Sequence, residues 1–154
     1  MTKTVVEMTH GRKITLEYGV INRDTIRAYT NGQCFAFAKA AAQLLKKKYS
    51  DSPYKGLVGV RLENPYPEEL QANPEAPAQL WHCFAYLPDG YLFDIRGPMD
   101  YDALMDEIEW ELQSFRTVHH TKAPDLWDQN NVPRSNMVAA TRFARLLLKE
   151  NGYL

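Results

Sequence analysis

The chain lacks a long apolar run, and this absence limits the classes of protein to which it can belong. No segment of its 154 residues approaches the roughly 20 consecutive apolar residues that a membrane-spanning helix requires. Residues 1–18 hold no uninterrupted apolar stretch of the length found in a signal peptide. We therefore expect a cytoplasmic protein without a membrane partner.

An excess of charge of one sign is also missing. The 18 basic and 19 acidic residues leave a formal net charge of −1, so the chain has no general attraction for nucleic acid. Arg142, Arg145 and Lys149 recur at helical spacing, but such a row is typical of the solvated face of an amphipathic helix. We expect no nucleic-acid partner and keep binding through this last helix as the weakest alternative.

Signatures of cofactors and metals are missing as well. No glycine-rich pattern of a dinucleotide or phosphate site occurs. His119 and His120 precede Asp125 and Asp128, but neither a cysteine pair nor a His-x-x-x-His spacing supports a metal centre. The sequence predicts no cofactor and no metal.

Length and composition are those of an ordinary globular domain. Apolar residues make up 45% and charged residues 24% of the chain, which predicts one domain over residues 1–154 with its own core. The patterns predict an α+β fold in which residues 20–29 are a loop or a weak helix and residues 116–133 are irregular. We expect strands over residues 4–8, 13–18, 56–62, 80–87 and 91–96, and helices over residues 35–49, 101–115 and 136–151.

Residues 63–79 contain four prolines and four glutamates, and neither lysine nor arginine. This composition predicts a long surface loop rather than a regular element. The loop is either a gate over a substrate site or a tolerated insertion, and the sequence leaves both open.

Cys34 is the first candidate for chemistry because it lies at the start of the clearest predicted helix. If Asn31 is the N-cap, Cys34 falls in the first turn, where free N–H groups and the helix dipole favour a thiolate. Asn31 and Gln33 are then placed to donate hydrogen bonds to an oxyanion or a substrate. The alternative is that Cys34 is a small buried apolar residue, which is common for cysteine.

The predicted hairpin supplies two partners for this thiol. Pro88, Asp89 and Gly90 fit a three-residue loop, which pairs Leu87 with Tyr91, Ala85 with Phe93, and Phe84 with Asp94. In that register His82 and Asp94 are diagonal neighbours on one face, and an aspartate so placed orients the histidine ring. A two-residue loop at Asp89-Gly90 would instead place the two side chains on opposite faces. Cys83 falls on the opposite face. We therefore interpret Cys83 as structural, and we expect no Cys34–Cys83 disulfide.

Two segments resemble the papain-like and transglutaminase-like cysteine enzymes. Residues 32–38 (GQCFAFA) resemble the nucleophile segment of that superfamily, and residues 81–94 (WHCFAYLPDGYLFD) resemble its histidine–aspartate hairpin. The resemblance implies a nucleophile helix packed on a small antiparallel sheet. It also implies that Cys34 is the nucleophile, that His82 is the base and acid, and that Asp94 orients the histidine.

These residues predict an acyl-transfer enzyme that acts on an amide or ester through a thioester on Cys34. Water as the acceptor makes it a protease, amidase or deamidase, and an amine makes it a transglutaminase-type enzyme. We favour hydrolysis because it requires no second substrate, and we expect a protein or peptide-like substrate. The alternative is a non-catalytic binding or inhibitor protein on a cysteine-enzyme scaffold.

Overall fold

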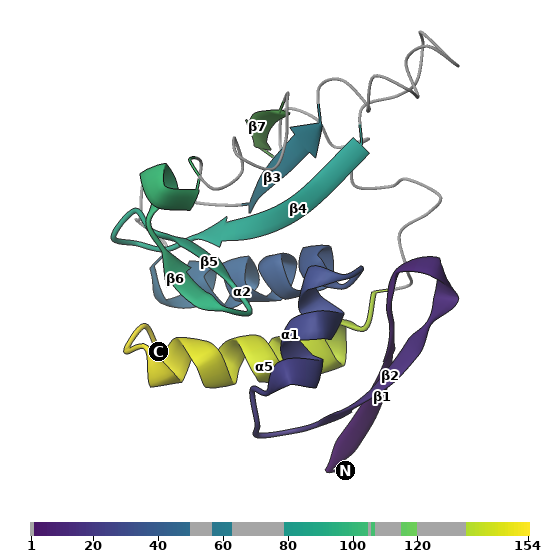
Figure 1. The fold of residues 1–154 in the computed structure, drawn as a ribbon. Helices are drawn as coiled ribbons and strands as arrows, with labels where there is room; N and C mark the ends of the chain where they lie inside the picture. Colours follow the sequence, from purple (N-terminus) through teal and green to yellow (C-terminus); the bar gives the residue numbers. More distant parts are fainter. Residues whose placement is uncertain (1, 50–56, 63–78, 105, 107–114, 120–134) are drawn as a thin grey trace, which may run out of the picture.

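The computed structural model describes residues 2–49, 57–62, 79–104, 106, 115–119 and 135–154. Two antiparallel sheets and three longer helices make up this part of the chain, which confirms a mixed α+β fold (Figure 1). A two-stranded sheet pairs β1 (Lys3–Glu7) with β2 (Lys13–Glu17). A five-stranded sheet follows the order β6-β5-β4-β3-β7.

The N-terminal hairpin matches its sequence pattern. β1 and β2 pair in register, and alternation buries Val6 and Leu16 while Lys3, Lys13 and Glu17 are exposed. Their connection is a short 3-10 turn, η1 (Thr9–Gly11), in which His10 and Gly11 adopt positive φ angles of 66° and 72°. Glycine tolerates that conformation well, which explains why the turn forms there.

Helix α1 (Arg23–Thr30) resolves the segment that the sequence left ambiguous. Its start is fixed by a capping box: the Asn22 side chain accepts a hydrogen bond from the Thr25 amide at 3.1 Å, and the Thr25 hydroxyl accepts one from the Asn22 amide at 3.1 Å. These bonds satisfy backbone donors that a helix start leaves free. The capping box therefore supports a helix in a segment whose apolar residues show only weak helical periodicity.

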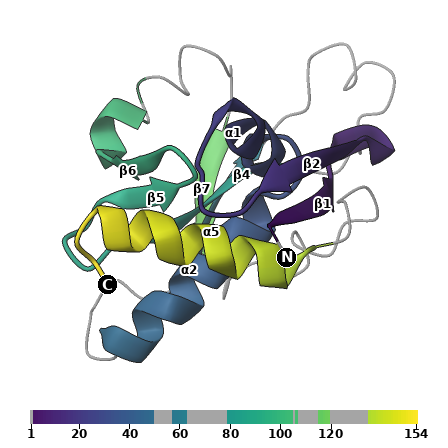
Figure 2. The same ribbon diagram turned by 90° about the horizontal axis from the view of Figure 1, so that it is seen from below.

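Helix α2 (Cys34–Lys48) lies between the five-stranded sheet and helix α5 (Met137–Glu150), as Figures 1 and 2 show. Small side chains allow this close approach on two sides: Ala36, Ala38, Ala40 and Ala41 are all buried. Phe37 stacks on Phe93 of the sheet, with ring centroids 5.6 Å apart. The Tyr29 ring lies against Phe37 at 5.5 Å and against Phe143 at 5.8 Å. Burying each large apolar side chain contributes roughly 1.5–3 kcal/mol.

The five-stranded sheet contains β3 (Leu57–Leu62), β4 (Gln79–Tyr86), β5 (Leu92–Asp94), β6 (Gly97–Met99) and β7 (Phe115–His119). β4 is flanked by β3 and β5, and its hairpin with β5 lies over α2. The antiparallel sheet with a helix packed on it agrees with the expected arrangement of elements.

Two sequence expectations about the middle of the chain are wrong. Residues 116–119, expected to be irregular, form most of β7 and pair with β3. Phe115, expected to end a helix, is the first residue of that strand. An edge strand obtains its hydrogen bonds from a neighbour distant in sequence, so the local pattern does not predict it. Residues 101–104 are helical, and Asp100 accepts a hydrogen bond from the Ala103 amide.

Helix α5 begins one residue later than predicted. Its N-cap is Asn136, whose side chain accepts a hydrogen bond from the Ala139 amide at 3.1 Å. The predicted loop over residues 63–79 lies outside the described residues except for Gln79, which is the first residue of β4. Within the described part of the chain, none of the helices combines the length and apolar character needed to cross a membrane.

Candidate functional site

The loop between β4 and β5 sets the register of the site. The Leu87 amide donates to the Tyr91 carbonyl at 2.8 Å, and Gly90, with a φ of 93°, donates to the Leu87 carbonyl at 3.0 Å. Ala85 pairs with Phe93. These contacts confirm the predicted three-residue loop, in which glycine closes a bulged hairpin.

His82 and Asp94 meet on this hairpin. The distance from His82 Nε2 to Asp94 Oδ2 is 2.9 Å, and the two residues are only 4% and 2% exposed. Because Nε2 faces the carboxylate, Nδ1 is the ring nitrogen left to face a thiol. The sequence-based placement of these two side chains side by side is therefore correct.

Arg96 is a third member of this group that the sequence interpretation missed. Its amide donates to Asp94 Oδ1 at 2.8 Å, and its Nη2 lies 2.7 Å from Asp94 Oδ2. Burial alone would raise the pKa of Asp94, but the hydrogen bonds from His82 and Arg96 and their positive charges lower it. Asp94 is thus an ionised carboxylate held from two sides. The signal for Arg96 was its position two residues beyond Asp94.

Cys34 is the first residue of α2 and is partly buried. It packs against the small buried cluster formed by Ala38 and Cys83. The hydrogen bond from the Cys83 thiol, with the hydrogen bond and charge of His82, outweighs desolvation and lowers the pKa of Cys34 well below its ordinary value. The thiol therefore meets the first requirement of a nucleophile.

His82 carries the complementary charge. Burial opposes the imidazolium, but the hydrogen bonds and charges of Asp94 and Cys34 raise the pKa of His82 to about 9. A lowered thiol pKa beside a raised histidine pKa favours the thiolate–imidazolium form of the pair.

Asn31 and Gln33 occupy positions other than those expected. Gln33, not Asn31, is the N-cap of α2 and makes no capping bond with its side chain, so the predicted cap is wrong. Asn31 instead ends α1, where its Nδ2 donates to the Arg27 carbonyl at 2.9 Å. The Asn31 side chain is therefore bonded to the last turn of the preceding helix, which the Asn-Gly-Gln sequence does not predict.

The Gln33 side chain is 1% exposed and links two elements. Its Nε2 donates to the Glu7 carbonyl of β1 at 2.8 Å, and its Oε1 accepts from the Asn136 amide at 3.3 Å. These bonds fix the start of α2 relative to β1 and α5. A role for Asn31 or Gln33 as an oxyanion donor stays a prediction.

The sequence interpretation of Cys83 is partly wrong. Cys83 is fully buried with Ala38, on the sheet face that also presents Ala85 and Phe93 to α2. The predicted face is therefore correct, but it does not separate Cys83 from Cys34, because α2 packs on that same face. Burial and the neighbouring Cys34 raise the pKa of Cys83, so it is a protonated thiol. Both cysteines are free.

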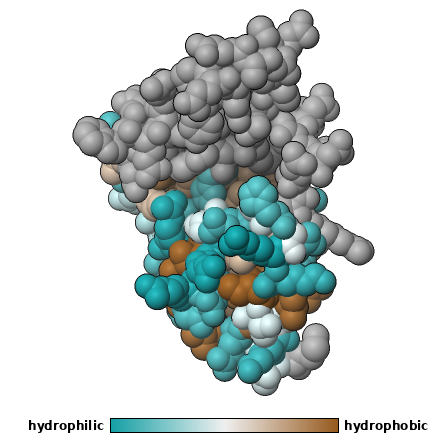
Figure 3. All heavy atoms as spheres, turned by 45° about the vertical axis from the view of Figure 1, so that its right-hand side comes forward, coloured by the Kyte–Doolittle hydropathy of each residue, from teal (hydrophilic) through white to brown (hydrophobic). Residues whose placement is uncertain are grey.

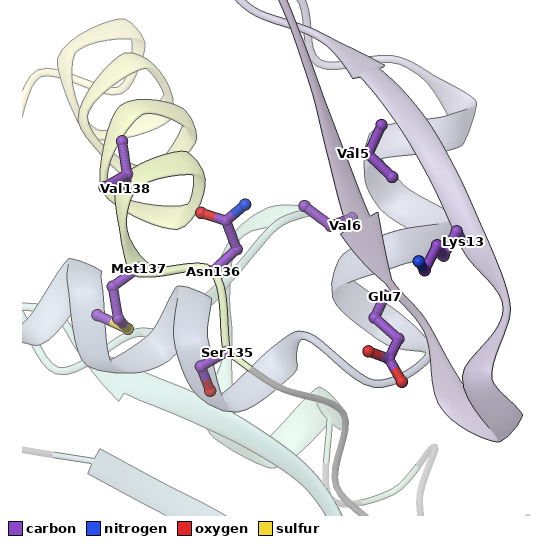
Figure 4. Close-up of a pocket in the computed structure, with 8 residues that line it drawn as sticks. All are labelled: Val5, Val6, Glu7, Lys13, Ser135, Asn136, Met137 and Val138. Carbon is purple, nitrogen blue, oxygen red and sulfur yellow. The ribbon is translucent and has the colours of Figure 1, made fainter.

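A cleft of about 530 Å³ lies between the N-terminal hairpin and the start of α5 (Figure 4). It is lined by Val5, Val6, Glu7, Lys13, Ser135, Asn136, Met137 and Val138. Of these residues, Val5 and Val138 are 54% and 72% exposed. Figure 3, which turns the right-hand side of Figure 1 forward, shows apolar patches interrupted by hydrophilic groups on the described part of the surface. Gln33 binds two of the lining residues, which connects the cleft wall to the residue before Cys34.

The described residues contain no group of three or more histidine, cysteine or acidic side chains arranged to hold a metal ion. Of the four residues weighed as metal ligands, His120, Asp125 and Asp128 lie outside the described residues, and of His119 only the backbone, in β7, is described. Comparisons with models of protein families, with curated proteins and with solved structures found no match. The function is therefore argued from the site itself.

Proposed function

We propose that this chain is a cysteine-nucleophile acyl-transfer enzyme that acts on an amide or ester through a thioester on Cys34. The observation that carries the proposal is the buried His82–Asp94 hydrogen bond of 2.9 Å beside the acidic thiol of Cys34. A buried ion pair of this kind is expensive to maintain for stability alone, whereas it suits a nucleophile that must be ionised at neutral pH.

In the acylation step, the Cys34 thiolate attacks the carbonyl carbon and forms a carbon–sulfur bond. The carbonyl π electrons move to oxygen, and the resulting oxyanion then expels the leaving group. His82, as the imidazolium, gives its proton to the leaving amine or alcohol. The products of this half-reaction are a thioester on Cys34, a neutral His82 and the free leaving group.

In the second step, neutral His82 accepts a proton from water or an amine as that acceptor attacks the thioester. The carbon–sulfur bond breaks, and Cys34 returns as a thiolate beside a protonated His82. Asp94 holds the ring throughout, and its charge stabilises the imidazolium each time it forms. Hydrolysis stays the preferred reaction because it uses no second substrate.

The oxyanion requires donors near the sulfur. The Cys34 backbone amide lies in the first turn of α2, where a helix has no internal acceptor for it. It therefore supports the proposal as one donor. The relation to papain-like and transglutaminase-like enzymes belongs to the same proposal, and it is supported by the Cys, His, Asp order and by the antiparallel sheet packed on α2.

The proposal is tested with an activated acyl ester as the probe. Wild-type protein is expected to form a covalent acyl adduct, which peptide mass spectrometry assigns to Cys34, and then to release it. His82→Ala should slow acylation by about a hundredfold or more, the usual contribution of a positioned acid–base group. Asp94→Asn should slow it by a smaller factor because the ring loses a charged partner.

Asp102→Asn is the matched control, since it makes the same chemical change at an exposed carboxylate. Equal acylation of the wild-type and His82→Ala proteins, or an adduct on a residue other than Cys34, contradicts the proposal. Either result favours the alternative of a non-catalytic binding protein on this scaffold.

A further inference from the structure

Cys34 and Cys83 form a pair of thiols that the acyl-transfer chemistry does not require. The Cys34 side chain packs in one small cluster with Ala38 and the fully buried Cys83. The Cys83 thiol lowers the pKa of Cys34, Cys34 raises that of Cys83, and neither cysteine is in a disulfide. Cys34 belongs to α2 and Cys83 to β4, so the pair joins the helix to the sheet.

We propose that Cys34 and Cys83 form a peroxide-responsive thiol–disulfide site, in which Cys83 resolves a sulfenic acid that forms on Cys34. The ligand class is a hydroperoxide, of which hydrogen peroxide is the simplest member. The inference depends on the contact between the two thiols and on the access to Cys34. It does not depend on whether the chain transfers acyl groups.

The order of events follows from the difference between the two thiols. Cys34 is partly exposed and acidic, and an accessible thiolate is the form of cysteine that reacts with peroxides. Cys83 is fully buried and protonated, so peroxide reaches it poorly. This pairing of an outer reactive thiol with an inner resolving thiol is typical of redox-sensing cysteines.

The first step oxidises Cys34 by two electrons. The thiolate attacks one oxygen of hydrogen peroxide, a sulfur–oxygen bond forms and the oxygen–oxygen bond breaks. The departing hydroxide takes the proton of the His82 imidazolium and leaves as water. Cys34 is then a sulfenic acid, and His82 is neutral.

The second step forms the disulfide. The sulfur of Cys83 attacks the sulfur of the Cys34 sulfenic acid, and the sulfur–oxygen bond breaks. The hydroxide that leaves carries away the thiol proton of Cys83 as water. One peroxide and two thiols have then become one disulfide and two waters, and the nucleophile of the proposed acyl transfer is masked.

The test uses the full chain, first reduced and then treated with one equivalent of hydrogen peroxide. Intact mass spectrometry should show a loss of about 2 Da, the two hydrogens removed when a disulfide forms. Digestion with trypsin under non-reducing conditions should yield one cross-linked species of residues 28–39 and residues 62–96, which contain Cys34 and Cys83 respectively. Dithiothreitol should restore both thiols and the alkylation of Cys34.

The Cys83→Ser variant isolates the resolving step. With dimedone present during oxidation it should accumulate a labelled sulfenic acid at Cys34. Without dimedone it should proceed to sulfinic acid, which dithiothreitol does not reverse. The wild-type mapping needs no variant, so the inference can be tested even if Cys83→Ser folds poorly.

Two outcomes overturn the inference. One is sulfinic acid on Cys34 of the wild-type protein without a cross-linked peptide, and the other is a disulfide between Cys34 residues of two chains. The acyl-ester probe reports separately on the proposed function. Disulfide formation without acylation leaves this inference standing alone, and acylation without disulfide formation refutes only the inference.

Discussion

Replacing Cys83 by alanine should make Cys34 a weaker acid. The Cys83 thiol donates a hydrogen bond to Cys34, and this bond is the largest single reason that the pKa of Cys34 is low. Alanine removes the donor and leaves the charge of His82 in place. The nucleophile should therefore remain, but it should be less ionised at a given pH.

The size of the effect follows from the kind of bond that is lost. A hydrogen bond to a charged group contributes about 1.5–3 kcal/mol, and a thiol is a weak donor, so the lower limit applies. A loss of about 1.4 kcal/mol corresponds to one pKa unit. The pKa of Cys34 should rise by about one unit, and alkylation below both pKa values should slow by about tenfold.

The assay is the rate of alkylation by iodoacetamide as a function of pH, read at Cys34 by peptide mass spectrometry. Cys83→Ser is the matched variant, because its hydroxyl keeps a donor at the same position and should retain most of the wild-type profile. Profiles for wild type and Cys83→Ala that coincide would refute the reasoning. Such a result would assign the acidity of Cys34 to His82 and the helix start.

Three further predictions concern stability, each measured by urea unfolding. Asp94→Asn should destabilise the protein by about 3 kcal/mol at pH 7, because it breaks a buried ion pair. The pKa of Asp94 is lowered on folding, so its ionised form stabilises the fold above a pH of about 4. The difference in unfolding free energy between wild type and Asp94→Asn should therefore vanish as the pH falls through the folded pKa. A difference that persists in acid would contradict this. Gln33→Leu should lower the free energy of unfolding by about 1–3 kcal/mol, since two backbone groups lose their partner, whereas no change would show that water replaces the amide. Asn22→Ala should lower it by about 1 kcal/mol through loss of the capping box, while Asn22→Ser should retain most of it; equal midpoints for Asn22→Ala and wild type would show that the cap contributes nothing.

The sequence by itself determined the local features of the site. Pro88, Asp89 and Gly90 fit the three-residue loop that brings His82 and Asp94 together, and the structure has this loop rather than the two-residue loop that Asp89-Gly90 also fits. The start of α2 near Cys34 followed from a strong helical pattern that ends in three lysines. These are short-range properties, and strand alternation carries them over the few residues that separate the partners.

Only the tertiary structure decided which residues meet Cys34. Cys83 was assigned to the correct sheet face, but the sequence does not state that α2 packs on that face. Gln33 became a buried link to β1 and α5 because these elements, distant in the chain, supplied its partners. β7 was missed for the same reason, since an edge strand exists through its pairing with β3.

The acidity of the thiol is therefore a property of the assembled fold. Helix position alone lowers a thiol pKa, but the largest contribution comes from Cys83 on β4, 49 positions further along the chain. The sequence determined which side chains are capable of this chemistry and how two of them align. Packing of α2 on the sheet lowers the pKa of Cys34, because hydrogen bonds and charge act over a few ångströms in space regardless of separation along the chain.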